Sequence, residues 1–118
     1  MFDAQLLMGK GTEAVSVYSP WFSRRGDSLI ATLDIVALDG AFTTLTVDVF
    51  TKNSQDTGDG TNANALVSIV SGSVGPSRAT WEGVLEEMVR YKFTLREAQP
   101  NWVLFRMLEP AWFDAVKA

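Results

Sequence analysis

The sequence of 118 residues contains neither cysteine nor histidine. Without cysteine, the chain forms no disulfide and offers no thiolate nucleophile or zinc–thiolate site. The lack of histidine removes the usual general base at neutral pH, the commonest metal ligand, and every serine–histidine or cysteine–histidine nucleophile. An enzyme made from this chain would have to work with carboxylate, lysine or tyrosine side chains. We therefore expect a protein that is not an enzyme, with no catalytic residues, no cofactor and no metal.

Long apolar runs and basic clusters are also missing. No segment approaches the roughly 18 consecutive apolar residues of a membrane-spanning helix, so we expect no membrane partner. The net charge is −4, and the largest basic cluster is Arg24–Arg25. A nucleic-acid-binding protein normally carries a basic face that neutralises phosphates, so nucleic acid is not an expected partner. Asp3 stands where a signal peptide carries positive charge, and we therefore expect a protein that is not secreted.

The composition is that of a globular protein. Hydrophobic residues make up 47% of the chain and charged residues 20%, and no internal repeat or shift in composition divides it. These values predict a single domain over residues 1–118, long enough to bury a core.

The dominant pattern along the chain is an alternation of apolar and polar residues with a period of two, which predicts strands. In the run 28–38, one face carries Leu29, Ala31, Leu33, Ile35 and Ala37. The run 41–51 alternates in the same way, and Asp39–Gly40 between the two predicts a β-hairpin. The runs 88–96 and 102–108 also alternate. The turn Gln99–Pro100–Asn101 between them predicts a second hairpin.

The remaining segments give weaker signals. The segments 13–19 and 65–72 are shorter strand candidates. The segment 80–88 has apolar residues at helical spacing and fits either a single helical turn or an irregular entry to the next strand. The tail 110–118 begins with Pro110 at a possible first helical position, but it is too short to be stable unless it docks. Together the segments predict an all-β, antiparallel, jelly-roll-like β-sandwich with at most one short helix.

One polar stretch, KNSQDTGDGTNAN at 52–64, separates two hydrophobic runs. A helix-flanked calcium loop that began at Asp56 would need oxygen ligands at its third and fifth positions, which are Gly58 and Gly60. An irregular calcium site with Asp56, Asp59 and Asn62 remains open beside a solvated connection. We expect a surface-exposed loop that is either mobile or ordered by a neighbouring subunit.

Two further patterns suggest function. Asp34 and Asp48 lie on the polar faces of the first two runs, and two carboxylates about 5 to 9 Å apart perform acid–base chemistry in glycoside hydrolases. The four tryptophans and seven phenylalanines are many for this length. They fit a core, sugar-stacking platforms or a protein interface. Aromatic and arginine residues gather in 19–27 and in the tail, which predicts that a partner protein contacts Trp21, Phe22, Arg24, Arg25, Trp112 and Phe113.

Three stretches, YSPWFSRRGDSLIATLDIVAL at 18–38, VFTKNSQDTGDG at 49–60 and VLFRMLEPAWFDAVKA at 103–118, resemble the decoration or cement proteins of tailed bacteriophages. Several of those proteins are jelly rolls on the outside of the capsid. The resemblance implies a structural protein that binds the major capsid protein and associates with copies of itself on the capsid. It also implies a protein located in the virion after synthesis in the host cytoplasm. A carbohydrate-binding module that uses exposed tryptophans is the alternative, and a small carboxylate enzyme is the third.

Overall fold

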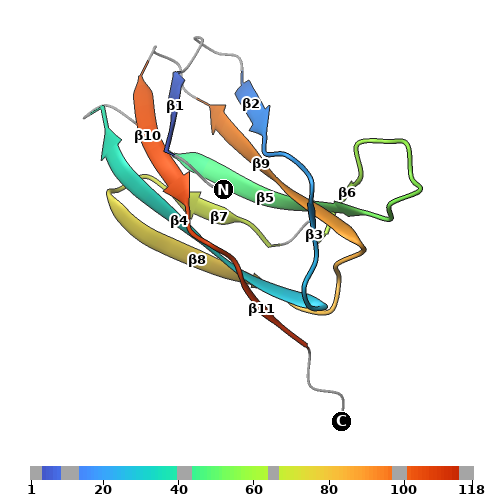
Figure 1. Ribbon diagram of the computed structural model, residues 1–118. Helices are drawn as coiled ribbons and strands as arrows, with labels where there is room; N and C mark the ends of the chain where they lie inside the picture. Colours follow the sequence, from blue (N-terminus) through green and yellow to red (C-terminus); the bar gives the residue numbers. More distant parts are fainter. Residues whose placement is uncertain (1–3, 9–13, 40–43, 64–66, 97–100, 115–118) are drawn as a thin grey trace.

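The structure is a computed structural model that describes residues 4–8, 14–39, 44–63, 67–96 and 101–114 (Figure 1). The regular elements among these residues are all strands. They are β1 (Gln5–Met8), β2 (Ala14–Tyr18), β3 (Phe22–Ser23), β4 (Ser28–Leu38), β5 (Leu45–Lys52), β6 (Thr61–Asn62), β7 (Ile69–Ser71), β8 (Gly75–Trp81), β9 (Met88–Arg96), β10 (Trp102–Met107) and β11 (Ala111–Phe113). The predicted all-β fold is confirmed. No helix in the described ranges has the length and apolar character needed to cross a membrane.

The strands form two antiparallel sheets that pack face to face as a sandwich (Figure 1). The first, the β4 sheet, has the order β1–β10–β4–β8, and β11 pairs with β4 beyond the end of β10. The second, the β5 sheet, has the order β2–β9–β5–β6. In this sheet β3 pairs with β9 beyond the end of β2, and β7 pairs with β5.

The pairing has the nested order of a jelly roll. β1 pairs with β10, β2 with β9, β4 with β8, and β5 with β6 and β7. The first strand therefore lies beside the last long strand, the second beside the one before it, and so on inward. A single long hairpin rolled into two sheets gives this order, which is the jelly-roll arrangement of two Greek keys.

Both predicted hairpins are wrong, although their strands exist. β4 and β5 belong to different sheets, and so do β9 and β10. A strand has two edges, and β4 uses both on β10, β11 and β8, while β5 uses both on β9, β6 and β7. Consecutive strands cross between the sheets because each apolar face needs a facing sheet to cover it. The turn residues Gly40, Gln99 and Pro100 lie outside the described residues.

The core lies between the inner faces of the two sheets. Leu33 and Ile35 of β4 are fully buried opposite the sheet that carries Val47 and Val49 of β5. Aromatic rings add the largest buried volume. The Phe93 ring of β9 and the Phe105 ring of β10 have centroids 4.9 Å apart, and this contact joins the two sheets.

A β-bulge in β4 changes which residues face the core. The register with β10 passes from Phe105↔Ile35 to Leu104↔Ala37, which leaves Val36 as the extra residue. Val36 is exposed, and after it Leu38 packs against the core. The sequence prediction that Ala37 shares the face of Ile35 is therefore wrong, because the inserted residue reverses the alternation.

The segment 80–88 is a strand end, a crossing and a strand start, with no helical turn. Two buried hydroxyl groups, one from each sheet, accept hydrogen bonds from the segment that crosses between the sheets. The Gly83 N–H donates to Ser28 Oγ at 2.9 Å, and the Glu86 N–H donates to Thr51 Oγ1 at 2.7 Å. Leu85, between these contacts, is buried in the core. The helical spacing in the sequence thus reflects the burial of Trp81 and Leu85 in the core where the chain crosses between the sheets.

Candidate functional site

An open hollow lies between the segments that contain β3 and β11. It holds about 480 Å³, and we call it the aromatic hollow; it is lined by Phe22, Ser23, Arg25, Glu109, Pro110 and Trp112. Phe22 comes from β3 of the β5 sheet, and Trp112 comes from β11 of the β4 sheet. Their rings meet edge to face with centroids 6.2 Å apart. The hollow therefore spans the join between the two sheets.

Close backbone contact fixes the walls of the aromatic hollow. A Cβ added at Gly26 would lie 2.7 Å from the Phe113 carbonyl oxygen, so only glycine permits this approach. The Asp27 N–H donates to Asp114 Oδ1 at 3.2 Å across the same gap. The tail that was predicted to need docking is docked as a strand on β4, and residues 115–118 lie outside the described residues.

The six predicted partner-binding residues divide into two groups. Phe22, Arg25 and Trp112 line the aromatic hollow. The other three serve the fold in other places. Arg24 donates through its guanidinium to the Leu85 carbonyl and through its N–H to the Glu87 carbonyl, and the Phe113 backbone lies against Gly26.

Trp21 lies in a separate cluster with basic residues of the β5 sheet. The Arg90 guanidinium carbon is 3.9 Å from the Tyr18 ring centroid and 4.5 Å from that of Trp21. Lys52 Nζ lies 4.6 Å from the Trp21 centroid. Cation–π contacts of this kind stabilise by about 0.5–1 kcal/mol where exposed and more where water is excluded. The Arg90 side chain is only 11% exposed, so this stack is largely dry.

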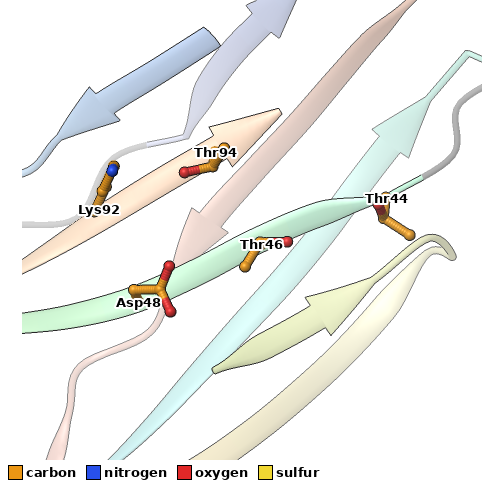
Figure 2. A pocket seen from close by; sticks show the side chains of 5 residues that line it. All are labelled: Thr44, Thr46, Asp48, Lys92 and Thr94. Atoms are coloured by element: carbon orange, nitrogen blue, oxygen red, sulfur yellow. The ribbon is translucent and has the colours of Figure 1, made fainter. Parts of the chain in front are cut away.

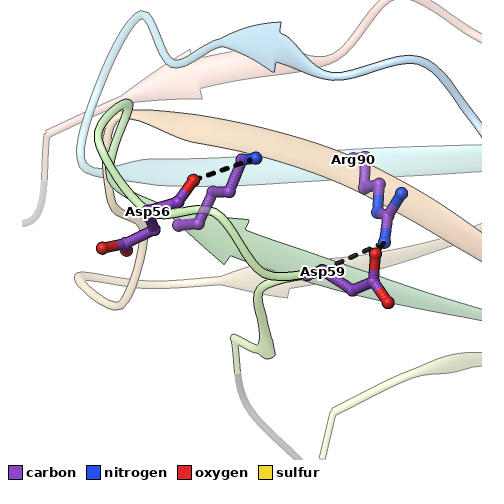
Figure 3. A network of polar contacts seen from close by, with 4 residues as sticks. Asp56, Asp59 and Arg90 are labelled. Carbon is purple, nitrogen blue, oxygen red and sulfur yellow. Dashed lines mark hydrogen bonds and ion pairs between the residues drawn. The ribbon is translucent and has the colours of Figure 1, made fainter.

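The same stack holds the polar loop. Arg90 Nη2 donates to the Asp59 carbonyl at 3.0 Å and lies 3.6 Å from the Asp59 carboxylate (Figure 3). Further along the loop, Ser54 contacts the Glu87 carboxylate through its N–H and its hydroxyl. The predicted exposure of residues 53–59 is confirmed. Contacts within the chain connect residues 52–63 to β9 and to Glu87. The expectation that the loop is either mobile or ordered by a neighbouring subunit stays a prediction, and Asn64 lies outside the described residues.

The loop carboxylates do not converge on one point. Asp56 Oδ2 accepts a hydrogen bond from the Asn53 N–H at 3.0 Å, and Asp59 faces Arg90 (Figure 3). Within the described ranges, no three acidic side chains are grouped as a metal site would require. Asp56 and Asp59 therefore each make a contact within the chain that supports the conformation of the loop.

Asp34 and Asp48 cannot act as the predicted pair. Asp34 lies on the outer face of the β4 sheet, 2.9 Å from the Arg106 guanidinium. Asp48 lies on the outer face of the β5 sheet. The carboxylates are on opposite sides of the sandwich, so that hypothesis is wrong.

Asp48 belongs instead to a polar groove, which is lined by Thr44, Thr46, Asp48, Lys92 and Thr94 and holds about 420 Å³. Figure 2 shows these side chains in two lines, along β5 and along β9. Burial raises the pKa of Asp48, and the hydrogen bond with the Asn62 side chain and the nearby Lys92 ammonium offset only part of this effect. The sequence signal of this groove is the threonine-rich polar face, which also fits ordinary solvent exposure.

Replacing Asp48 by asparagine should change how stability depends on pH. The folded protein holds the Asp48 proton more strongly than the unfolded chain does, because the folded pKa is raised. The stabilisation that this proton gives to the folded protein is fully present below the unfolded pKa of about 3.9. It is lost as the pH rises through the folded pKa. The free energy of unfolding in urea, taken as Asp48→Asn minus wild type, should therefore be more favourable to the variant at pH 7 than at pH 3. A constant difference between the two pH values, as expected for the non-titrating control Thr46→Val, would contradict this.

An apolar patch on the outer face of the β4 sheet was not predicted from the sequence. Leu6 and Met8 of β1 are 58% and 52% exposed, and the bulged Val36 is 46% exposed. Leu104 of β10 pairs with Leu6 and lies between β1 and β4. Contiguous exposed apolar surface of this kind marks interaction sites. The bulge could not be read from the sequence, because apolar residues occupy every position from Ile35 to Leu38.

Comparisons with known proteins give no family for this chain. No protein-family model matches the sequence, and no curated protein or solved structure matches it.

Proposed function

We propose that this protein is a non-enzymatic structural protein of a virion that binds the major capsid protein on the outside of a phage head and stabilises the capsid. The observation that carries the proposal is the convergence of Phe22, Arg25 and Trp112, from distant parts of the sequence, on one open hollow. Aromatic and arginine residues are the types most enriched at binding hot spots. Close backbone contacts hold this hollow in shape, so little ordering is needed when a partner binds.

Two other features support a protein-binding role. The jelly roll is a two-sheet scaffold of a kind that recurs in viral capsid domains. The apolar patch of Leu6, Met8, Val36 and Leu104 offers a second contact surface, away from the aromatic hollow, for the self-association expected on a capsid.

The alternative function, a carbohydrate-binding module that uses exposed tryptophans, has less support. Trp81 is fully buried, and its indole Nε1 has no hydrogen-bond partner within the described residues. Trp21 has cations over its ring, and Trp112 meets Phe22. A sugar-stacking platform needs an open ring face, which the buried Trp81 does not offer and which Lys52 and Arg90 occupy at Trp21.

Charge reversal of Arg25 should strongly weaken capsid binding. Arg25 is exposed at the hollow, so Arg25→Glu should leave the fold intact while it places a negative charge in the contact. We expect affinity to fall about thirtyfold or more, as for a hot-spot loss of about 2 kcal/mol. The measurement is co-sedimentation with expanded capsids made from the major capsid protein of the phage to which the proposal assigns this protein. Trp112→Ala should weaken binding similarly, with folding checked by circular dichroism.

Arg78→Glu is the matched control. Arg78 is an exposed arginine on β8, and β4 separates that strand from β11 in the same sheet. This variant should bind like the wild type. If the wild type does not sediment with capsids, or if both charge reversals weaken binding equally, the proposed contact is wrong.

A further inference from the structure

The polar groove is assembled from strands that only the tertiary structure brings together. The register sets Tyr18 of β2 opposite Lys92 of β9, and Lys92 opposite Asp48 of β5. Two residues further along each strand, on the same face, Thr94 pairs with Thr46. Three adjacent strands thus present two cross-strand rows of polar side chains with one aromatic ring at the rim.

The donors and acceptors of the groove match a neutral polyhydroxyl ligand. Each threonine hydroxyl both donates and accepts, the Asp48 carboxylate accepts, and the Lys92 ammonium donates. The two charges cancel, so the groove has no net attraction for an anion or a cation. An apolar ligand would leave these polar groups without partners, which is costly. A sugar, whose hydroxyls also donate and accept, meets all of these requirements.

The Tyr18 and Phe50 rings lie beside the polar residues of the groove, and the Arg90 guanidinium covers one face of the Tyr18 ring. The Tyr18 and Phe50 rings meet edge to face with centroids 6.0 Å apart, and Tyr18 is 41% exposed. Lys92 Nζ lies 5.8 Å from the Tyr18 centroid and 5.7 Å from that of Phe50. Lys92 therefore lies between the polar residues of the groove and these two rings. The volume of about 420 Å³ falls within the range of about 300–1,000 Å³ typical of small-ligand sites.

We propose that the polar groove on the outer face of the β5 sheet binds a neutral carbohydrate, with Asp48, Lys92 and the threonine hydroxyls bound to sugar hydroxyls. This function is separate from capsid binding, because the groove and the aromatic hollow share no lining residue. Burial has already removed part of the water around Asp48, so a sugar displaces less solvent from the carboxylate when it binds.

The test is titration of the folded, ¹⁵N-labelled protein with neutral trisaccharides built from glucose, mannose, galactose or N-acetylglucosamine. At least one should cause saturable NMR shifts at Thr46, Asp48, Lys92 and Thr94. Asp48→Asn removes a charged acceptor and should weaken that binding about tenfold. Thr46→Val removes only a hydroxyl from a strand that favours valine, and it should weaken binding about threefold or more.

Thr80→Val, an exposed threonine on β8 of the other sheet, should leave the affinity unchanged. Three results would each overturn the inference. They are a panel with no shift at 10 mM sugar, shifts that map outside the groove, and binding that neither Asp48→Asn nor Thr46→Val weakens. Capsid sedimentation of the same variants separates the two functions, since groove variants should still sediment with capsids.

Discussion

Replacing Phe105 by alanine is expected to lower the free energy of unfolding by about 3–5 kcal/mol. The Phe105 side chain is only 1% exposed, and its ring packs 4.9 Å from Phe93 of the opposite sheet. The Phe93 ring also meets the Tyr91 ring at 6.1 Å, so the loss would open a cavity at the centre of an aromatic column. Small domains are stable by only about 5–15 kcal/mol, so this variant should be close to unfolding.

Urea unfolding followed by far-ultraviolet circular dichroism measures this change. Leu104→Ala is the control, because Leu104 is the preceding residue of β10 and faces outward, half-buried. It should lose about 1 kcal/mol or less. A loss below about 1.5 kcal/mol for Phe105→Ala, or an equal loss for both variants, would mean that Phe105 does not join the sheets as described.

Replacing Gly60 by alanine is expected to cost about 2–4 kcal/mol and to release the polar loop. Gly60 has φ of +80°, a left-handed conformation that disfavours any residue with a Cβ. A Cβ at this position would lie 2.8 Å from the Thr51 carbonyl oxygen and 2.8 Å from the Trp21 ring. The backbone cannot yield easily, so the loop must move away from Trp21.

Gly58→Ala provides a control in the same loop. A Cβ at Gly58 would meet nothing within 4 Å, and Gly58 does not have a positive φ. This variant should be neutral or more stable by about 0.4–1 kcal/mol, because alanine restricts the unfolded chain. Thermal unfolding and Trp21 fluorescence compare the two variants. Equal stability of both would show that the loop does not pack on Trp21.

The loop shows how far a polar sequence can be interpreted. Its lack of apolar residues correctly predicted exposure, since nothing in 53–59 can enter a core. Its contacts include Arg90 and Glu87, which lie 31 and 33 residues away from their partners in the loop. Local pattern carries no information about such distant partners. Calcium was considered because acidic residues are close in sequence, whereas their side chains are directed to different partners.

The candidate site was predicted in part for a similar reason. Aromatic and arginine residues in 19–27 and in the tail led to six predicted partner-binding residues, and the structure brings three of them, Phe22, Arg25 and Trp112, to one hollow. Composition could not separate Phe22 and Trp112, which share one hollow, from Trp21, which packs under basic side chains. The polar groove was not predicted, because the polar faces of β5 and β9 each fit an ordinary solvent-facing strand.

The sequence by itself determined the positions of the long strands and the faces that they bury, because alternation with a period of two is a property of each strand alone. Tertiary structure decided which strands pair. Alternation is satisfied equally by a hairpin partner or by a distant one, and here covering both inner faces required consecutive strands to lie in opposite sheets. The bulge at Val36, the aromatic hollow and the polar groove all follow from that pairing, and so only the folded chain contains them.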